Sequence, residues 1–440
     1  MKKPLALILT LVMILSLVAC AAKTTEAPAA EAPAAEAPAE EAPVALPYEG
    51  VTLTFWWPPY SEGDQSYWDG VLQEFTAQTG AVVETTIVPW EELSTKYLAG
   101  FMSGEGPDVF YMTNEMMADM HDAGAILDLT PYFTSDELAT RLYWNSGSAF
   151  GGQYAAPFSV DTSFRGMAFN LDLLKAAGVE SVPTTWDEMI DAAVKVKDAN
   201  VCEYPVAYEA ADAAGGVLNA FLPTLWSAGG NIVSADGTTA TMDSDAALRT
   251  CQYFYDLVYT YGVMSTDCTS INTQGIADLF LEGKIAMCNI VANMLSKVDQ
   301  STINFDYTVT LGLSDGTNHA KTFYPIDTMS VNAGSKNVDA AIALLKFITS
   351  AETHSNFREN VHASQVQLHT TEAAPEYPTQ WVADNMAVLN DYAMVMPVAK
   401  GVPAMQAALF TNYQLLIMGE LTPEECVAAM QDACATALSE

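Results

Sequence analysis

Two stretches of the chain place aromatic side chains at the end of a strand-like run, and in the second an amide follows. The first is the segment 56–60, WWPPY, and the second contains Tyr111 and Asn114. Aromatic rings stack on apolar C–H faces, while amides and carboxylates hydrogen-bond hydroxyl groups. Trp57, Tyr60, Tyr111 and Asn114 are therefore candidate contacts for a small polar molecule. Core packing is the alternative role for Trp57, and helix capping is the alternative for Asn114.

The elements that would position these residues alternate between strand and helix. Strand-like runs occupy 51–57, 81–88 and 108–112, and helix-like periodicity occupies 66–78 and 91–102. This alternation predicts an α/β fold with a parallel sheet and right-handed crossovers. Capping-box patterns predict further helix starts near Thr134, Thr185 and Thr422. Long helices are also expected at 272–282, 337–349, 405–418 and 423–438.

Patterns of known catalytic or metal-binding sites are absent from the sequence. The five histidines form no H-E-x-x-H, and there is neither a G-x-S-x-G elbow nor a P-loop. With 54 acidic residues, a carboxylate pair such as a glycosidase uses will always be found. We expect no catalytic residue, no metal site and no cofactor. An extracellular hydrolase is the enzymatic alternative; a surface adhesin would need repeats or a β-rich body.

The charge of the chain restricts its partners. The formal net charge is −37, from 54 acidic and 17 basic residues. A chain this acidic is repelled by phosphate backbones, so nucleic acid is excluded as a partner. Aromatic residues make up 10% of the chain, which predicts a folded protein.

The amino-terminal segment has the features of an export signal. Lys2 and Lys3 precede an apolar run over 5–19, too short to span a bilayer comfortably, and the run ends at Cys20. This ending resembles a bacterial lipobox, which implies that 1–19 is removed and that Cys20 is acylated, as with palmitate. An ordinary signal peptide is the alternative. Residues 20–47 are rich in Ala, Pro and Glu and are expected to form an extended spacer.

The remaining cysteines form no recognisable motif. Six follow Cys20, and none belongs to a C-x-x-C pair. Cys426 and Cys434 are eight residues apart on a predicted helix, about 12 Å at 1.5 Å per residue, so they cannot bond to each other. The pairing of the others stays open.

Five segments together resemble a known family. They are 90–110, ending in GEGPDVF; 152–158, GQYAAPF; 169–188, which contains FNLDLLKAAGV and PTTWDE; 280–287, FLEGKIAM; and 335–352, which begins SKN. In this order they resemble the family 1 extracellular solute-binding proteins of bacterial importers, the group that contains maltose-binding protein. The resemblance covers nearly all of 51–440.

The resemblance implies a type II two-lobe fold with ligand held between the lobes. The implied amino-terminal lobe comprises 48–160 and 326–372, and the carboxy-terminal lobe comprises 163–322 and 376–440. It further implies a monomer, anchored by lipid to the outer face of the cytoplasmic membrane. Such a protein captures a carbohydrate and passes it to the transmembrane subunits of an ABC permease. A different polar solute, such as glycerol phosphate or a polyamine, is the alternative ligand.

The resemblance adds four candidate ligand contacts. Asp161 falls in the expected first crossing between lobes, where hydrogen bonding to the hinge backbone is the alternative. Trp226 falls in a segment that resembles the family's helix ending in Gly-Gly, and core packing is its alternative. Asn293 stands where the family often has tryptophan, and Asp327 lies in the second crossing, where the family often has glycine. Asn293 weakens the expectation of a stacked sugar at its position, whereas Asp327 is a candidate contact for a hydroxyl or a cationic group of the ligand.

Overall fold

The computed structural model describes residues 45–59, 63–361 and 365–440. The expected signal peptide, the lipidation site Cys20, most of the spacer and the candidate contact Tyr60 lie outside these residues. In the described part of the chain, no helix is long and apolar enough to cross a membrane.

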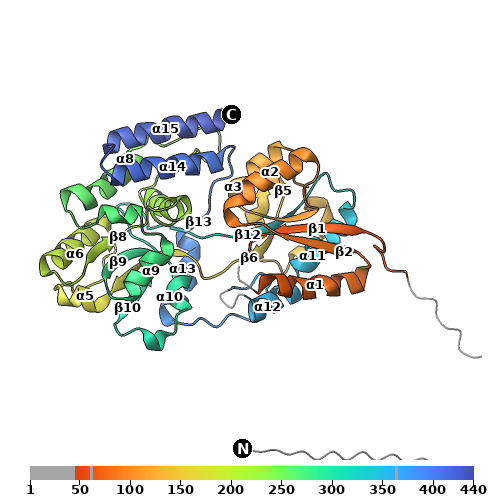
Figure 1. The fold of residues 1–440 in the computed structure, drawn as a ribbon, viewed down its shortest axis with the longest axis horizontal. Coiled ribbons are helices and arrows are strands. Elements are labelled where there is room, and N and C mark those ends of the chain that lie inside the picture. Colours follow the sequence, from red (N-terminus) through yellow and green to blue (C-terminus); the bar gives the residue numbers. More distant parts are fainter. Residues whose placement is uncertain (1–44, 60–62, 362–364) are drawn as a thin grey trace, which may run out of the picture. The chain divides into compact units, whose positions relative to one another are not determined.

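The first of two main sheets has the strand order β2-β1-β3-β12-β6 (Figure 1). Its strands are β1 (Thr52–Trp57), β2 (Val82–Ile87), β3 (Val109–Met112), β6 (Ala156–Ser159) and β12 (Asp327–Val331). β1 is parallel to β2 and β3, whereas β12 is antiparallel to β3 and β6. The helices of this half are α1 (Asp64–Thr79), α2 (Leu93–Ser103), α3 (Asn114–Asp122), α4 (Ser135–Leu138), α11 (Val338–Ile348) and α12 (Ala351–Asn360). The alternation predicted for 51–112 is confirmed, with ends that differ by at most two residues.

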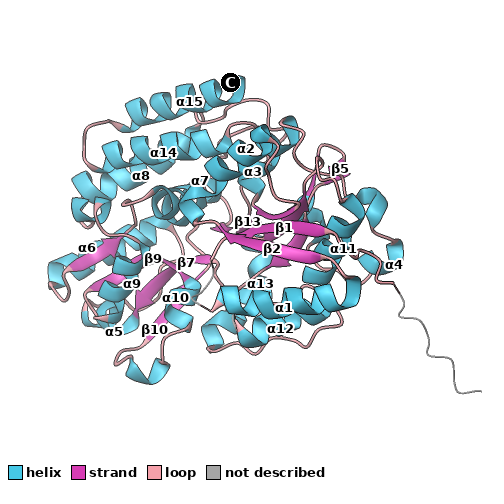
Figure 2. Ribbon diagram, turned by 45° about the vertical axis from the view of Figure 1, so that its right-hand side comes forward, coloured by secondary structure: helices cyan, strands magenta, loops and turns pink. Residues whose placement is uncertain are grey.

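The second main sheet has the order β10-β7-β9-β8 (Figure 2). Its strands are β7 (Arg165–Asn170), β8 (Tyr204–Ala207), β9 (Ile285–Val291) and β10 (Tyr307–Thr310). β7 is antiparallel to both β9 and β10, and β8 is parallel to β9. Its helices are α5 (Leu171–Ala176), α6 (Trp186–Ala199), α7 (Leu222–Ser227), α8 (Asp245–Tyr255), α9 (Thr273–Leu281), α10 (Ala292–Ser296), α13 (Gln380–Tyr392), α14 (Val402–Ile417) and α15 (Pro423–Ser439).

Shorter elements complete the chain. The minor strands are β4 (Ser148–Ala149), β5 (Gly152–Gln153), β11 (Thr322–Phe323) and β13 (Ala393–Met394), paired β4 with β5 and β11 with β13. Two stretches, η4 (Ala214–Phe221) and η5 (Asp256–Thr260), are π-helical. The 3-10 turns are η1 (Trp90–Glu92), η2 (Thr130–Tyr132), η3 (Trp144–Gly147), η6 (Thr266–Thr269) and η7 (Gln300–Thr302).

The predicted helix starts are observed, with one variation. Thr134 and Thr422 each form a complete capping box with the glutamate three residues later. Thr185 accepts a hydrogen bond from the backbone N–H of Glu188, but the Glu188 carboxylate binds the backbone and hydroxyl of Thr184 instead. Each arrangement satisfies backbone donors that the first helical turn leaves without intrahelical partners.

Each main sheet is covered by its own apolar core. Around the first sheet, Phe55, Trp57 and Trp68 pack together at ring-centroid distances of 5.2 to 6.4 Å. Around the second, helices α6, α8, α14 and α15 bury a separate and larger set of apolar side chains. Burial of this apolar surface is the main force that holds each half together. The chain passes between the halves after β6, before β12 and after α12.

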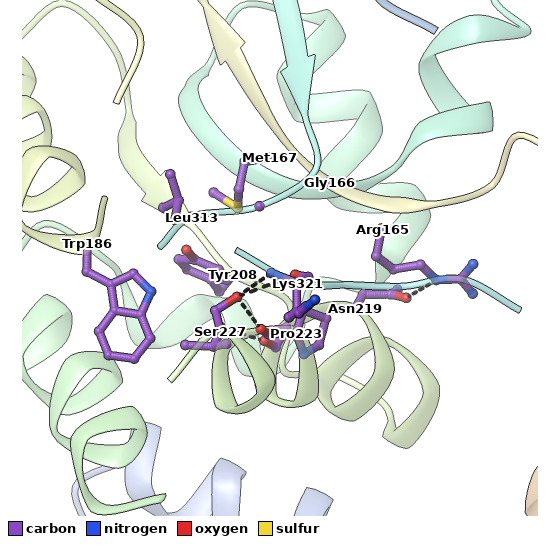
Figure 3. Close-up of a pocket in the computed structure, with 13 residues that line it drawn as sticks. Arg165, Gly166, Met167, Trp186, Tyr208, Asn219, Pro223, Ser227, Leu313 and Lys321 are labelled. Carbon is purple, nitrogen blue, oxygen red and sulfur yellow. Dashed lines mark hydrogen bonds between the residues drawn. The ribbon is translucent and has the colours of Figure 1, made fainter. Parts of the chain in front are cut away.

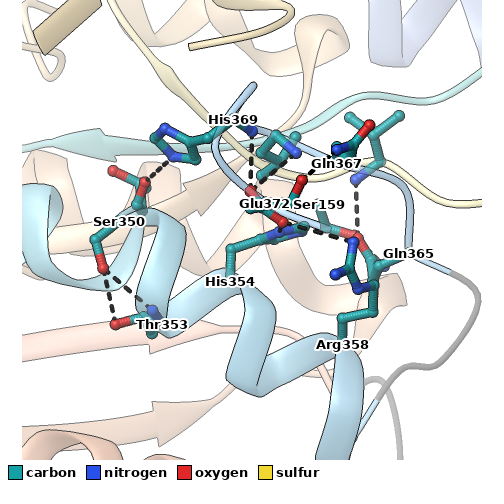
Figure 4. Close-up of polar contacts among 12 residues, drawn as sticks. Ser159, Ser350, Thr353, His354, Arg358, Gln365, Gln367, His369 and Glu372 are labelled. Carbon is teal, nitrogen blue, oxygen red and sulfur yellow. Dashed lines mark hydrogen bonds and ion pairs between the residues drawn. The ribbon is translucent and has the colours of Figure 1, made fainter. Parts of the chain in front are cut away.

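The third of these passages is held by a buried carboxylate (Figure 4). Glu372 accepts hydrogen bonds from the backbone N–H groups of Leu368 and His369 at 3.1 and 2.9 Å, and lies 2.7 Å from His354 Nδ1. Arg358 adds a longer ion pair of 3.7 Å to the same carboxylate. One acid is thus surrounded by groups that stabilise its negative charge, which fixes the segment 365–372 against α12.

Candidate functional site

Arg165 lies where the first passage between the halves enters β7. Its Nε donates to Asn219 Oδ1 at 2.8 Å (Figure 3), and its Nη1 donates to the carbonyl of Ser163 at 2.5 Å. The guanidinium also lies 5.0 Å from the ring centre of Phe323. Contacts with one side chain, the adjacent backbone and an aromatic ring fix the direction of this cation.

Four carboxylates act on Arg165. Burial lowers the pKa of the guanidinium, and Asp161, Asp327, Glu209 and Glu115, in decreasing order, raise it. The four acids come from the first passage, from the start of β12, from the end of β8 and from α3. Four acidic groups drawn from both halves of the molecule therefore act on one guanidinium, and burial raises the pKa of one of them, Glu115.

Glu209 is the most deeply buried of these acids, at 1% exposure. Its Oε2 accepts from Thr273 Oγ1 at 2.6 Å and from Asn219 Nδ2 at 3.2 Å. Burial, together with the neighbouring Asp212 carboxylate, raises the Glu209 pKa to about 7, although its hydrogen bonds with Thr273 and Asn219 oppose the rise. Asn219 thus links Glu209 to Arg165, and Glu209 changes charge near neutral pH.

A glycine allows Glu209 to fit at this place. A Cβ atom on Gly215 would lie 1.6 Å from Glu209 Oε1, so any other residue here would push the Glu209 carboxylate out of its place. Gly215 belongs to the π-helical stretch η4, which also carries Asn219. Wide π-helical turns occur often at functional sites, and here one supplies both the close backbone approach and the linking amide.

On the other side of the site, Tyr111 connects β3 to the second passage. Its hydroxyl donates to Asp327 Oδ1 at 2.7 Å. The ring of Trp90 meets the Tyr111 ring edge-on at 5.4 Å, and its indole N–H donates to the Pro59 carbonyl at 2.8 Å. Trp90 is 45% exposed. An oriented aromatic ring is therefore open to solvent beside the Tyr111–Asp327 pair.

The remaining candidates from the sequence have different surroundings. Trp57 and Trp226 are buried in the two apolar cores, at 0% and 3% exposure. Asn114 is the first residue of α3, makes no capping bond there, and is buried at 8% exposure. Its Oδ1 has no hydrogen-bond partner among the described residues. Asn293 is partly buried on α10.

Asp161 has contacts of both kinds considered from the sequence. Its carboxylate accepts from the backbone N–H of Ser163 at 2.8 Å, and it also acts on Arg165. An isolated β-bridge joins Asp161 to Gln365, whose side chain bonds the backbone of Val160. The first and third passages are therefore tied to each other next to the Arg165 group.

Two cavities of the molecule differ in the size and polarity of the molecule that each could hold. The cavity drawn in Figure 3, between Arg165 and Trp186, has a volume of about 20 Å³, room for roughly one water molecule. A groove of about 430 Å³ lies between α2, α3 and the start of α14, but its lining is mainly apolar, with Leu98, Met102, Met116 and Met120. Asp119, its one carboxylate, accepts from the Gly401 backbone at 3.0 Å. Neither space offers the convergent polar groups found around Arg165.

Trp90, Glu209 and Asn219 were not among the residues chosen from the sequence. Trp90 and Glu209 each follow a strand within three residues, after β2 and β8, so a place just after a strand is the sequence signal that marks both. Asn219 lies inside a helix, and no sequence signal marks it. Among the described residues, no group of three or more His, Cys, Asp or Glu side chains could hold a metal ion.

Comparison with known proteins identifies the family. Residues 59–354 match the model of the bacterial extracellular solute-binding proteins. The chain belongs to this family. A binding protein of Brucella abortus is 24% identical over 388 residues, covering 86% of this chain and 90% of the relative.

Solved structures of this solute-binding family share the fold. The GacH receptor of Streptomyces glaucescens, solved without ligand and with acarbose, matches with a TM-score of 0.69 at 24% identity over 88% of this chain and 98% of its own. Maltose-bound MalE3 of T. maritima matches with a TM-score of 0.71 at 21% identity over 88% and 99% of the two chains. The type II two-lobe α/β fold expected from the sequence is thus confirmed.

Proposed function

We propose that this solute-binding protein captures a sugar or short oligosaccharide beside Arg165 and delivers it to an ABC importer. The proposal rests on one observation: polar and charged side chains from both halves interact around Arg165. Arg165 and Glu209 come from one half and Tyr111 and Glu115 from the other, while Asp161 and Asp327 come from the passages between them. Carboxylate, amide and guanidinium groups together can bond to several hydroxyls of one ligand. The relatives bound to acarbose and maltose support a carbohydrate.

Trp90 is the ring we assign to stacking. Trp90 is 45% exposed while Trp57 and Trp226 are enclosed in the cores, so its ring can reach the apolar side of a pyranose. Asn114 contributes a buried amide oxygen that lacks a donor, and a ligand hydroxyl would supply one. Tyr111, Asp161 and Asp327 remain in the proposed site. Asn293 and Tyr60 remain candidates at its edge.

The excess of carboxylates also bears on the class of ligand. Four acids around one guanidinium disfavour glycerol phosphate, because a phosphate would meet more negative than positive charge. The same excess would accept a polyamine, which is the alternative ligand that this cluster favours.

Isothermal titration calorimetry against neutral oligosaccharides, amine-bearing solutes and glycerol phosphate tests the proposal. We expect a neutral or amine-bearing sugar to bind and Trp90→Ala to weaken it about tenfold, the scale of one aromatic contact. Tyr261→Ala is the matched control. It removes an aromatic ring that is 40% exposed and does not belong to the proposed site, so it should leave the affinity unchanged. Binding of a polyamine but of no sugar would favour the alternative, and product release from a glycan without a transporter would favour a hydrolase.

We further infer that residues 48–160 and 326–372 form one lobe and 163–322 and 376–440 the other, and that the protein acts as a monomer. Acylated Cys20 would hold it at the outer face of the cytoplasmic membrane, where the permease subunits can reach it. Palmitate labelling of the natural chain, with Cys20→Ser as the control, tests the anchor. An unlabelled natural chain would contradict it.

A further inference from the structure

Cys251 and Cys426 face each other inside the half of the molecule built on the second sheet. Cys251 lies on α8 and Cys426 on the first turns of α15. Their sulfur atoms are 3.8 Å apart, and both side chains are completely buried. Cys426 Sγ also lies 3.5 Å from the carbonyl oxygen of Asn412, on α14. The two thiols are therefore held in contact where three helices meet.

This pair differs from the other cysteines in the described part of the chain. Cys202, Cys268, Cys288 and Cys434 have no sulfur–sulfur contact there. A disulfide bond is about 2.05 Å long, so the Cys251 and Cys426 sulfurs need to approach by under about 2 Å, which small side-chain rotations can provide. Family membership places the folded chain outside the cytoplasm, where disulfides persist.

We propose that Cys251 and Cys426 form a disulfide bond in the exported protein. The oxidant is an external disulfide, either that of a thiol–disulfide oxidoreductase or a small-molecule disulfide. One cysteine thiolate attacks it, a mixed disulfide forms, and a thiol leaves. The second cysteine thiolate then attacks the mixed disulfide, releases the other thiol and closes the bond. Two electrons and two protons pass from the cysteine pair to the oxidant.

The bond has to form before α15 has packed. In the folded chain, the hydrogen bond with Cys426 and then burial raise the pKa of Cys251 well above its usual value, so little reactive thiolate exists. Full burial also keeps an external disulfide away from both sulfurs. Oxidation therefore belongs to folding after export, and reduced protein that has already folded reacts slowly.

The cross-link would join positions separated by 175 residues. It would fix the hairpin of α14 and α15 against α8. α14 also supports the binding site, because Gln414 donates to the carbonyl of Ala210, next to Glu209, at 2.8 Å. The bond is expected to raise stability without changing the residues that contact ligand, so it stands apart from the proposed function.

Peptide mapping of the exported full-length protein, alkylated without reduction, tests the proposal. We expect a fragment that joins Cys251 to Cys426, and alkylated Cys434 and Cys268. Reduction during unfolding should lower Tm by about 5 °C, the scale of one long-range cross-link in a chain of this size. Chain folded in a reducing cytosol should contain both thiols free, and refolding it with oxidised glutathione should restore the bond.

Variants separate this pair from the other cysteines. In Cys251→Ser, the Tm should no longer respond to reductant, whereas Cys434→Ser should respond as the natural chain does. Both cysteines alkylated in exported protein and after refolding with oxidised glutathione would overturn the proposal. So would a joined fragment containing a different pair. The mapping of the natural chain decides the matter even if a variant fails to fold.

Discussion

Two buried ionic groups in this molecule are balanced in opposite ways. Around Glu372, one acid receives two backbone N–H groups and contacts a histidine and an arginine (Figure 4). Around Arg165, one cation interacts with four acidic groups. A buried carboxylate whose charge is matched fastens a segment, whereas acids that outnumber their cation can also accept hydrogen bonds from a ligand's hydroxyl groups. The difference separates a structural cluster from a binding one.

The largest expected effect is a loss of stability when Glu372, the acid of the balanced cluster, is removed. Glu372→Ala leaves Arg358 and the backbone donors buried without their acceptor. Breaking a buried pair costs about 3–5 kcal/mol, so the unfolding free energy should fall by that order. Chemical denaturation measures it, and calorimetry at low temperature should find the ligand affinity retained. An affinity loss as large as the stability loss would erase the distinction between the two clusters.

Removing the cation from the unbalanced cluster should act on binding instead. Arg165→Met leaves four acids without their shared counterion, and we expect affinity to fall about 100-fold, or roughly 2.7 kcal/mol. Arg249→Met is the matched control, since Arg249 pairs with Asp315 at 3.0 Å and donates to the Ala228 carbonyl at 2.8 Å, and none of these residues belongs to the proposed site. Equal affinity losses in both variants would show a general effect of lost positive charge.

The titration of Glu209 sharpens the same comparison. Because its folded pKa is raised to about 7, the folded protein retains a proton that the unfolded chain loses near pH 4.5. This carboxyl therefore contributes stability below pH 4.5, and that contribution is lost as pH rises through about 7. The Tm of Glu209→Gln minus the Tm of the natural chain should therefore increase as the pH rises from 5 to 7.5. A constant difference in Tm over that range would show that Glu209 does not titrate there.

A smaller effect of opposite sign is expected in the balanced cluster. Burial lowers the pKa of His369, whose Nε2 lies 2.9 Å from the carbonyl oxygen of Thr349. The neutral ring therefore contributes stability above its ordinary pKa of about 6.5, and this is lost as pH falls. His369→Gln should weaken the dependence of Tm on pH between 5 and 7. An unchanged slope would assign that dependence to other groups.

The sequence predicted the fold well because its signals are local. Apolar periodicity and the caps at Thr134, Thr185 and Thr422 define helices without reference to distant residues. The site was predicted in part. Tyr111 and Asp327 were chosen separately, but their hydrogen bond joins positions 216 residues apart, and no local pattern contains that separation.

Burial explains why one tryptophan is a core residue and another is a candidate ligand contact. Trp57 and Trp90 each follow or end a strand, yet Trp57 is enclosed at 0% exposure while Trp90 is open. Alternation along β1 leaves a choice between two adjacent rings, and only packing against Phe55 and Trp68 decides it. The role of Asn219 was equally hidden, because it depends on the width of a helix turn.

That widened turn has a consequence for how such a protein could acquire a new ligand. A π-helical stretch holds an extra residue compared with an ordinary α-helix of the same span. Deleting one residue from 214–218 would let the turn relax to α-helical form, because a π-helical turn absorbs one extra residue; the helix that follows would keep its place, and side chains inside the stretch would shift by one position, about 100° around the axis. Asn219 would swing away from Arg165, and a neighbour would take its place. A single codon lost here could retune ligand choice while every strand stays where it is.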